Sequence, residues 1–234
     1  MAEPLPSVLV PGLNCSARLY GAQVPALWRF GPVMVARHTE DDAIVAIARR
    51  ILADAPARFA LVGLSMGGYI AFELLRQAPA RIARVALLDT AARADTPEQS
   101  ARRDHLIGLA RTGRLAEVVD ALWPVVVHEN RRDDQDLKYL VHVMADETGP
   151  DAFIRQQTAL KARPDYRGGL ADIRCPALVL VGDGDALTPP DRAEEIAAGI
   201  PGARLVKVPD CGHLSTLERP EAVNRALVEW LEAT

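Results

Sequence analysis

Six short runs of apolar residues recur along the chain and alternate with segments of amphipathic pattern. The runs cover residues 7–10, 33–36, 59–63, 85–88, 177–181 and 204–208. Short continuous apolar runs are typical of strands that are buried on both faces, as in a parallel sheet. Helical segments between such strands imply right-handed crossovers. The pattern therefore predicts an α/β fold, with a mostly parallel open sheet of about six strands and helices on both faces.

One long segment interrupts this alternation. From about residue 96 to residue 163, apolar positions recur at helical spacing and none of the runs resembles a core strand. The segment opens with Thr96-Pro97-Glu98-Gln99, a typical helix start with a capping residue and a first-turn proline. We expect a single domain in which residues 1–95 and 164–234 form the α/β core. Residues 96–163 are then a helical cap inserted over the carboxyl edge of the sheet.

Composition narrows the class of protein. The 234 residues are 49% apolar and 25% charged, and the net charge of -4 does not suggest nucleic acid as a partner. The amino-terminal residues lack the pattern of a secretion signal, and no apolar stretch is long enough to span a membrane. Three cysteines at unrelated spacings indicate reduced thiols. We expect a cytoplasmic monomer or homodimer that acts on a small molecule without membrane contact.

The strongest chemical signal surrounds Ser65. Residues 59–75 predict a strand, a tight turn at Gly63-Leu64-Ser65-Met66-Gly67 and then a helix, which is the context of a nucleophile elbow. A motif of this form would arise by chance about 0.02 times in a shuffled chain of this composition. At such a turn the serine hydroxyl is exposed at the top of the sheet and lies at a helix N-terminus, where negative charge is stabilised. Ser65 is the predicted nucleophile, and a serine that serves only the turn is the structural alternative.

A second glycine turn follows the first strand, in Val10-Pro11-Gly12-Leu13-Asn14. A loop in this place can direct a backbone N–H at the oxygen of a tetrahedral intermediate. We predict an oxyanion hole formed by the N–H groups of Leu13 and Met66. An ordinary β-turn remains the alternative for this loop.

The predicted base is His213, and three aspartates are candidates for its acid. His213 is the one histidine of five that lies on a loop leaving a late core strand. Asp183 and Asp185 follow the strand at 177–181, and Asp89 follows the strand at 85–88. A carboxylate at the end of a strand can hold an imidazole in the required tautomer. Serine, aspartate, histidine is also the chain order of the α/β hydrolases. Thr188 and Pro189 are expected to cap and open the next helix, with Asp191 completing the box.

Other chemistries find no support in the residues. Cys211 lies near His213, but no elbow or cationic neighbour would activate its thiol. The histidines make no metal-binding spacing, and glycine-rich nucleotide motifs are absent, so we expect neither a metal nor a cofactor.

The quoted motifs together resemble a known superfamily. GLSMGGY with Ser65, PALVLVGDGDALTPP with Asp185 and CGHLSTLERPEAV with His213 are similar, in order, to the three catalytic blocks of α/β-hydrolase-fold proteins. The segments LLDTAARADTPE and ERPEAVN resemble 3-oxoadipate enol-lactonases and related small-ester hydrolases. The resemblance favours Asp185 over Asp183 as the acid. Relatives usually begin with two further strands and carry His-Gly at the oxyanion turn, where this chain has Pro11-Gly12, so we expect a sheet that lacks those first two strands.

The resulting hypothesis is a serine hydrolase that cleaves a small carboxylic ester, thioester or lactone through an acyl-enzyme on Ser65. Trp123 and Phe153 of the cap are expected to line the substrate pocket. Two alternatives keep the triad and change the reaction, namely a carbon-carbon bond hydrolase and a cofactor-free haloperoxidase. A non-catalytic ligand receptor on the same fold is the alternative of another class.

Overall fold

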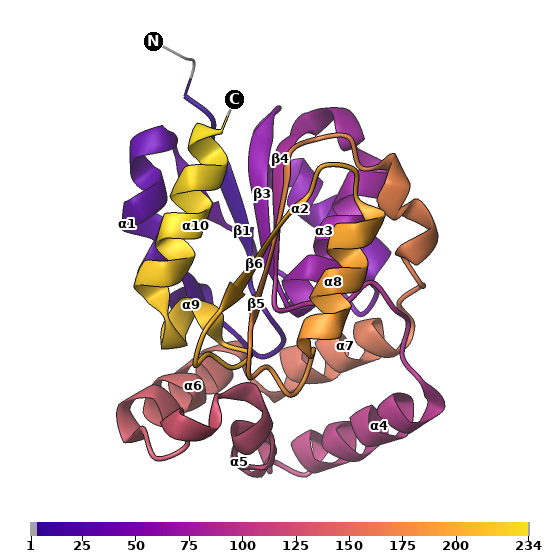
Figure 1. Ribbon diagram of the computed structural model, residues 1–234. Helices are drawn as coiled ribbons and strands as arrows, with labels where there is room; N and C mark the ends of the chain where they lie inside the picture. Colours follow the sequence, from indigo (N-terminus) through magenta and orange to yellow (C-terminus); the bar gives the residue numbers. More distant parts are fainter. Residues whose placement is uncertain (1–3, 234) are drawn as a thin grey trace.

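A computed structural model describes residues 4–233 and contains one sheet of six parallel strands (Figure 1). Each predicted apolar run is a strand, with bounds that differ by at most a few residues. Across the sheet the order is β2-β1-β3-β4-β5-β6, and every neighbouring pair is parallel. The strands are β1 (Ser7–Val10), β2 (Val33–Val35), β3 (Phe59–Leu64), β4 (Ile82–Leu88), β5 (Ala177–Gly182) and β6 (Arg204–Val208). The predicted α/β fold with six parallel strands is confirmed.

Successive residues of the central strands enter two different cores, because side chains alternate across a sheet. Leu61 and Val85 pack on one face, whereas Val62 and Ala86 pack on the other. The first face is covered by α2 (Ile44–Asp54), α3 (Met66–Gln77) and α8 (Pro190–Gly199). The second face is covered by α1 (Gln23–Leu27) and α10 (Pro220–Glu232), with α9 (Ser215–Glu218) below α10 in Figure 1. Burial on both faces explains why the strands are almost wholly apolar.

The segment between β4 and β5 is helical, as its periodicity predicts. It contains α4 (Pro97–Arg111), α5 (Leu115–Val126), α6 (Gln135–Thr148) and α7 (Pro150–Lys161), which lie together below the sheet in Figure 1. The expected capping box opens α4, where the Thr96 hydroxyl accepts from the Gln99 N–H and the Gln99 side chain accepts from the Thr96 N–H. Short 3-10 turns complete the described chain: η1 (Ala17–Tyr20), η2 (Trp28–Phe30), η3 (Pro79–Arg81), η4 (Glu129–Arg131) and η5 (Arg167–Asp172).

The parallel arrangement gathers the predicted site residues at one edge. The loops that contain Leu13, Ser65, Asp185 and His213 leave the carboxyl ends of β1, β3, β5 and β6. In an open α/β sheet this edge is where ligands bind. Within residues 4–233, every helix is too short or too polar to cross a bilayer.

Candidate active site

Ser65 stands at a strained turn between β3 and α3. Its φ of 55° and ψ of -112° lie outside the regions that residues with a side chain ordinarily adopt. The turn is held on both sides, because the Ser65 N–H donates to Leu88 O at 2.9 Å and the Thr90 hydroxyl donates to Ser65 O at 2.8 Å. The serine side chain is thus presented at the start of α3, as the elbow motif predicts.

Two glycines allow the close packing that this turn requires. A Cβ on Gly67 would lie 2.0 Å from Val10 O, and a Cβ on Gly63 would lie 2.3 Å from Gly67 O. Side chains at these positions would force α3 away from β1 and β3. The glycines of the motif are therefore explained by the approach of helix and strand.

The His213 ring contacts Asp185 in a buried pair. Nδ1 of His213 lies 2.8 Å from Oδ2 of Asp185, and both side chains are almost fully buried. Because the carboxylate accepts, Nδ1 carries the hydrogen and Nε2 is left as the free lone-pair nitrogen of the neutral ring. This is the tautomer that a general base at Nε2 needs.

Asp185 is held in place by three further donors. The N–H groups of Leu187 and Thr188 donate to Oδ1 at 2.8 and 2.9 Å, and the Thr188 hydroxyl donates to Oδ2 at 2.7 Å. Thr188 Oγ1 also lies 3.2 Å from Nδ1 of His213. The expectation that Thr188 caps the following helix was wrong: α8 begins at Pro190, and the threonine side chain is engaged by the histidine–aspartate pair.

The backbone of His213 is fixed by the helical segment. Its N–H donates to the carbonyl of Val126, the last residue of α5, at 3.1 Å. Burial by itself lowers the pKa of His213, but the charge and hydrogen bond of Asp185 outweigh burial and raise the pKa above its ordinary value. The site therefore stabilises the imidazolium form relative to a free histidine.

The other two candidate acids make different contacts. Asp183 is exposed, and its Oδ1 accepts from the Cys211 N–H at 3.3 Å. Asp89 is fully buried, accepts from the Gly182 N–H at 3.0 Å and accepts from the Ser215 hydroxyl. Burial, reinforced by the nearby charge of Asp185, raises the pKa of Asp89 well above its ordinary value. Asp185 is the one of the three candidates that contacts the imidazole.

The two backbone N–H groups expected to bind an oxyanion belong to Leu13, in the loop after β1, and to Met66, at the start of α3. Within residues 4–233, the N–H groups of Leu13 and Met66 donate to no protein acceptor. Asn14 has a φ of 58°, and its N–H donates to Oε1 of the buried Gln156 at 2.9 Å. Helix α7 thus holds this loop in place through Gln156.

His38 is a further contributor that the sequence did not reveal. Nε2 of this buried ring lies 2.9 Å from Gly12 O, so Nε2 must carry the hydrogen. Burial lowers the pKa of His38 to about 4, which keeps the ring neutral near pH 7. His38 follows β2, and only the pairing of β2 with β1 brings it under the glycine turn.

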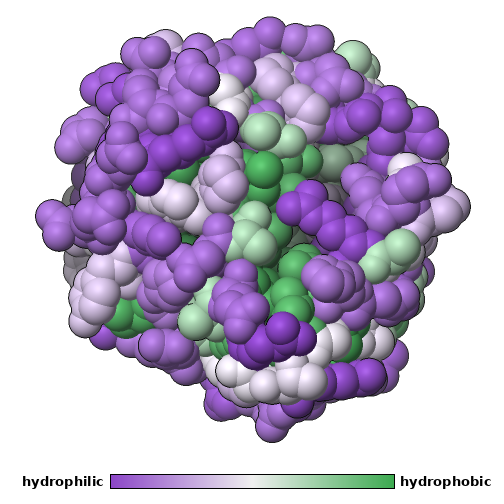
Figure 2. All heavy atoms as spheres, turned by 90° about the horizontal axis from the view of Figure 1, so that it is seen from below, coloured by the Kyte–Doolittle hydropathy of each residue, from purple (hydrophilic) through white to green (hydrophobic). Residues whose placement is uncertain are grey.

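A cavity of about 410 Å³ connects these parts and is bounded by the core and the helical segment. Ser65, His213, Leu13 and Thr188 lie on its wall. In the part of the chain that the structure describes, no hydrogen bond joins the Ser65 hydroxyl to His213. In the view from below, Figure 2 shows apolar residues exposed through the middle of a largely hydrophilic face. The apolar wall residues from the helical segment are Leu106, Val119, Leu122, Val126, Val141 and Leu160.

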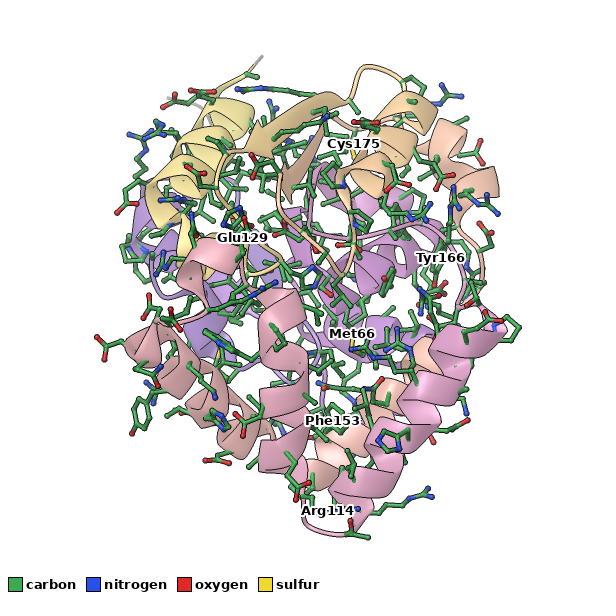
Figure 3. The ribbon with its side chains drawn as sticks, turned by 60° about the horizontal axis from the view of Figure 1, so that its bottom comes forward. Met66, Arg114, Glu129, Phe153, Tyr166 and Cys175 are labelled. Carbon is green, nitrogen blue, oxygen red and sulfur yellow. The ribbon has the colours of Figure 1, made fainter. Side chains whose placement is uncertain are left out.

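The structure does not place Trp123 or Phe153 on this wall, which corrects the expectation from sequence. Phe153 is fully buried in an apolar cluster formed between helices of the inserted segment. Figure 3 shows it below Met66, in the direction of Arg114. Trp123, a residue of α5, is buried in the core on the second face of the sheet, and its Nε1 donates to Arg132 O at 2.9 Å. Both side chains pack against neighbouring helices, and smaller aliphatic residues line the cavity.

The cysteines do not compete for the role of nucleophile. Burial raises the pKa of the Cys15 thiol to about 12, and burial together with the charges of Asp89 and Glu218 raises the pKa of Cys211 above its ordinary value. Among residues 4–233, no cluster of three or more histidine, cysteine, aspartate or glutamate side chains is arranged to hold a metal ion.

This combination of fold, elbow and histidine–aspartate pair agrees with the comparison with known families. Residues 8–226 match the model of the alpha/beta hydrolase family. The chain belongs to this family, and its relatives identify it as a hydrolase.

Individual relatives have several activities. An esterase from Thermogutta terrifontis is 31% identical, with a TM-score of 0.90 over 97% of this chain and 89% of that one. The enol-lactonase from Burkholderia xenovorans LB400 is 28% identical, with a TM-score of 0.88 over 99% and 93% of the two chains. BpoC of Mycobacterium tuberculosis, which carries a non-heme bromoperoxidase name, is 31% identical over 184 residues, or 75% of this chain and 68% of its own length.

Proposed function

We propose that the protein hydrolyses a small carboxylic ester, thioester or lactone through an acyl-enzyme on Ser65. The observation that carries the proposal is the buried bond from Nδ1 of His213 to Asp185, with His213 on the same cavity wall as the strained Ser65. A histidine held in this tautomer beside a serine is the arrangement of nucleophilic acyl transfer.

In the proposed reaction the Ser65 hydroxyl attacks the substrate carbonyl while Nε2 of His213 takes its proton. The tetrahedral oxyanion is bound by the N–H groups of Leu13 and Met66, which have no other acceptor in the described part of the chain. The imidazolium then gives its proton to the leaving alcohol, thiol or lactone oxygen. Water attacks the acyl-enzyme with the same histidine as base, which regenerates Ser65 and releases the carboxylic acid.

Proton transfer in this reaction requires the Ser65 hydroxyl to contact the His213 ring. Among the described residues no hydrogen bond joins the Ser65 hydroxyl to His213, and catalytic hydrogen bonds of this kind often tighten only when substrate binds. The His213 loop is anchored through its N–H to Val126, so we expect rotation of the serine side chain to close the contact.

Acyl transfer is consistent with the names of two of the relatives. The two solved structures of highest TM-score named above are described as an esterase and an enol-lactonase, which both act on acyl–oxygen bonds. The bromoperoxidase name of BpoC keeps a cofactor-free haloperoxidase as a second candidate. A panel of short-chain esters, thioesters and lactones, with a bromination assay beside it, separates these activities by kcat/KM.

A fluorophosphonate probe tests the proposal at its centre. We expect stoichiometric labelling of Ser65 in the folded protein and no labelling of the Ser65→Ala variant. Cys15→Ala serves as a control near the same cavity. Failure of the folded protein to react, together with no turnover of the panel, would refute the hydrolase mechanism and favour the receptor interpretation.

A further inference from the structure

The cavity wall carries an unbalanced set of charges away from the histidine–aspartate pair. Among residues 4–233, five arginines line the cavity and no aspartate or glutamate does. Two of the five are paired with acids behind the wall, because Arg93 binds Glu195 and Arg192 binds Asp191. The lining arginines are Arg93, Arg102, Arg103, Arg163 and Arg192.

Arg103 of α4 and Arg163, which follows α7, share a single acid. Arg103 binds Asp95 through Nε and Nη2, and Arg163 binds the same carboxylate through Nη1. The side chains of Arg163 and Asp95 are 3% and 1% exposed, and that of Arg103 is 18% exposed. Two guanidinium groups against one carboxylate leave one positive charge in excess. A charge that is shielded from water to this extent is unfavourable unless an anion compensates for it.

Unused hydrogen-bond donors lie at the same place. Arg163 donates through Nε to Arg93 O and through Nη1 to Asp95 and Leu160 O, but its Nη2 makes no hydrogen bond within residues 4–233. Gln157 of α7 is fully buried on the cavity wall, and its Oε1 accepts from Nη1 of Arg103 at 2.8 Å. The Nε2 of Gln157 has no partner among the described residues. Buried donors are nearly always satisfied, so the Nε2 of Gln157 calls for an acceptor, and the unpaired Nη2 of Arg163 is a second donor on the same cavity wall.

Arg163 is also held in one orientation. Its guanidinium lies over the ring of Tyr69, 4.2 Å from the ring centre, and its other hydrogen bonds fix the plane of the group. A guanidinium that is fixed in this way loses little freedom when it binds a planar carboxylate.

We propose that Arg163, Arg103 and Gln157 form a subsite for a carboxylate carried by the substrate at a distance from the scissile carbonyl. The enzyme's substrates are then esters, thioesters or lactones whose acyl chain ends in a carboxylate. The inference rests on the proposed function and refines its substrate class. Aliphatic residues of the same cavity wall, such as Leu106, would contact the connecting methylene groups.

Paired substrates test this subsite. The pairs are 4-nitrophenyl monoesters of unbranched dicarboxylic acids and the esters of methyl-terminated acids of equal length. We expect a higher kcat/KM for the carboxylate-terminated member of at least one pair. Arg163→Met and, separately, Gln157→Glu should lower that value by about 10- to 100-fold, the range implied by hydrogen bonds to charged groups. Both should change the value for the methyl-terminated ester by less than about threefold.

Controls separate the subsite from a structural role. Arg111→Met removes a positive charge at an exposed position of α4, the helix that carries Arg103, outside the cavity, and it should leave turnover of both esters unaffected. Gln157→Glu is nearly isosteric and keeps its contact with Arg103 as a charged pair, so it decides the matter if Arg163→Met fails to fold. Equal losses on both esters in a folded variant, or a wild-type protein that does not distinguish the pair, would overturn the subsite.

A binding measurement distinguishes failure of the subsite from failure of the proposed reaction. Calorimetric titration of the matching free dicarboxylic acid into Ser65→Ala does not depend on turnover. We expect saturable binding that Arg163→Met weakens by about 10- to 100-fold. Binding without ester turnover would leave the subsite standing and refute the acyl-transfer proposal, whereas turnover of methyl-terminated esters without binding would do the reverse.

Discussion

Two parts of the cavity wall differ in how completely their polar groups are satisfied. Around His213, the Asp185 carboxylate accepts from the imidazole, a hydroxyl and two backbone N–H groups. Around Arg163, a guanidinium nitrogen and the Gln157 amide have no acceptor within the described chain, and positive charge is in excess. The polar groups of the first wall, around His213, are satisfied by the protein itself, whereas those of the second wall, around Arg163, are not.

This difference separates the parts that react from the parts that recognise. A general base must be oriented before substrate arrives, because reorganisation during the reaction would raise the barrier. A recognition site instead needs donors that are free until the ligand supplies acceptors. Substitutions on the first wall should therefore affect every substrate, and substitutions on the second should affect only those that carry an anion.

The largest effect is expected at the nucleophile. Ser65→Ala should lower kcat by about five to six decades on carboxylate-terminated and methyl-terminated esters alike, as loss of the equivalent serine did in an unrelated protease. Steady-state rates with both esters provide the measurement, after a melting curve has shown that the variant folds. Retention of wild-type esterase activity would show that the wall around Ser65 and His213 is not the reacting part of the cavity.

The next effect distinguishes the two neighbouring aspartates. Asp185→Asn keeps the size of the side chain but removes the charge that orients His213, and it should lower kcat by about three to four decades. Asp183→Asn changes an exposed residue and should stay within about threefold of wild type. Kinetics of both variants on one neutral ester decide the point. The reverse ranking would transfer the role of acid to Asp183.

A smaller effect is expected beneath the oxyanion loop. His38→Leu removes the donor to Gly12 O and should lower kcat about 10-fold with little change in KM, since a misplaced loop weakens one oxyanion donor without removing it. His38→Gln can restore an N–H donor and should recover most of the activity. His105→Leu, at an exposed position of α4, serves as the control. Equal losses in the Leu and Gln variants would mean that the hydrogen bond does not matter.

The pH profile gives the most modest change. The pKa of His213 lies above its ordinary value, so kcat/KM should fall as the pH drops through a pKa above about 6.5. In Asp185→Asn the burial effect is opposed only by the charges of Asp89 and Glu218, so the pKa of His213 falls and the acid limb should move to lower pH. For stability the sign is opposite: the contribution of the raised pKa is present below the ordinary value and is lost as the pH rises through the folded value. A limb that stays in place in Asp185→Asn would contradict this assignment.

Local patterns predicted much of this molecule from sequence. The six strands are short apolar runs, and their type does not depend on distant contacts. The turn at Ser65 could be predicted because it requires glycine for steric reasons at Gly63 and Gly67, and both residues lie within one strand–turn–helix unit. The parallel order then gathers the loops at one edge, which made Asp183, Asp185 and Asp89 candidate partners of His213, and the resemblance to α/β hydrolases favoured Asp185.

The remainder depends on partners that are far apart in the chain. Thr188 matches a capping signal equally well, but its hydroxyl instead contacts Asp185 and the distant His213 ring. His38 reaches Gly12 through sheet pairing, and Gln156 reaches Asn14 across a separation of 142 residues. Large apolar residues such as Phe153 resemble pocket residues in sequence but are buried between helices. Nothing in the local pattern indicates that Arg103 and Arg163 share Asp95.

The hydrogen bond from His213 to Val126 has a consequence for how new specificities arise in this family. The helix that screens the cavity also supplies the carbonyl that secures the base. A chimera that exchanges the whole inserted segment for that of a relative would alter selectivity and the setting of the imidazole together. Exchanging only the helices that carry Arg103 and Gln157, and retaining α5, should redirect substrate choice without disturbing the proton relay.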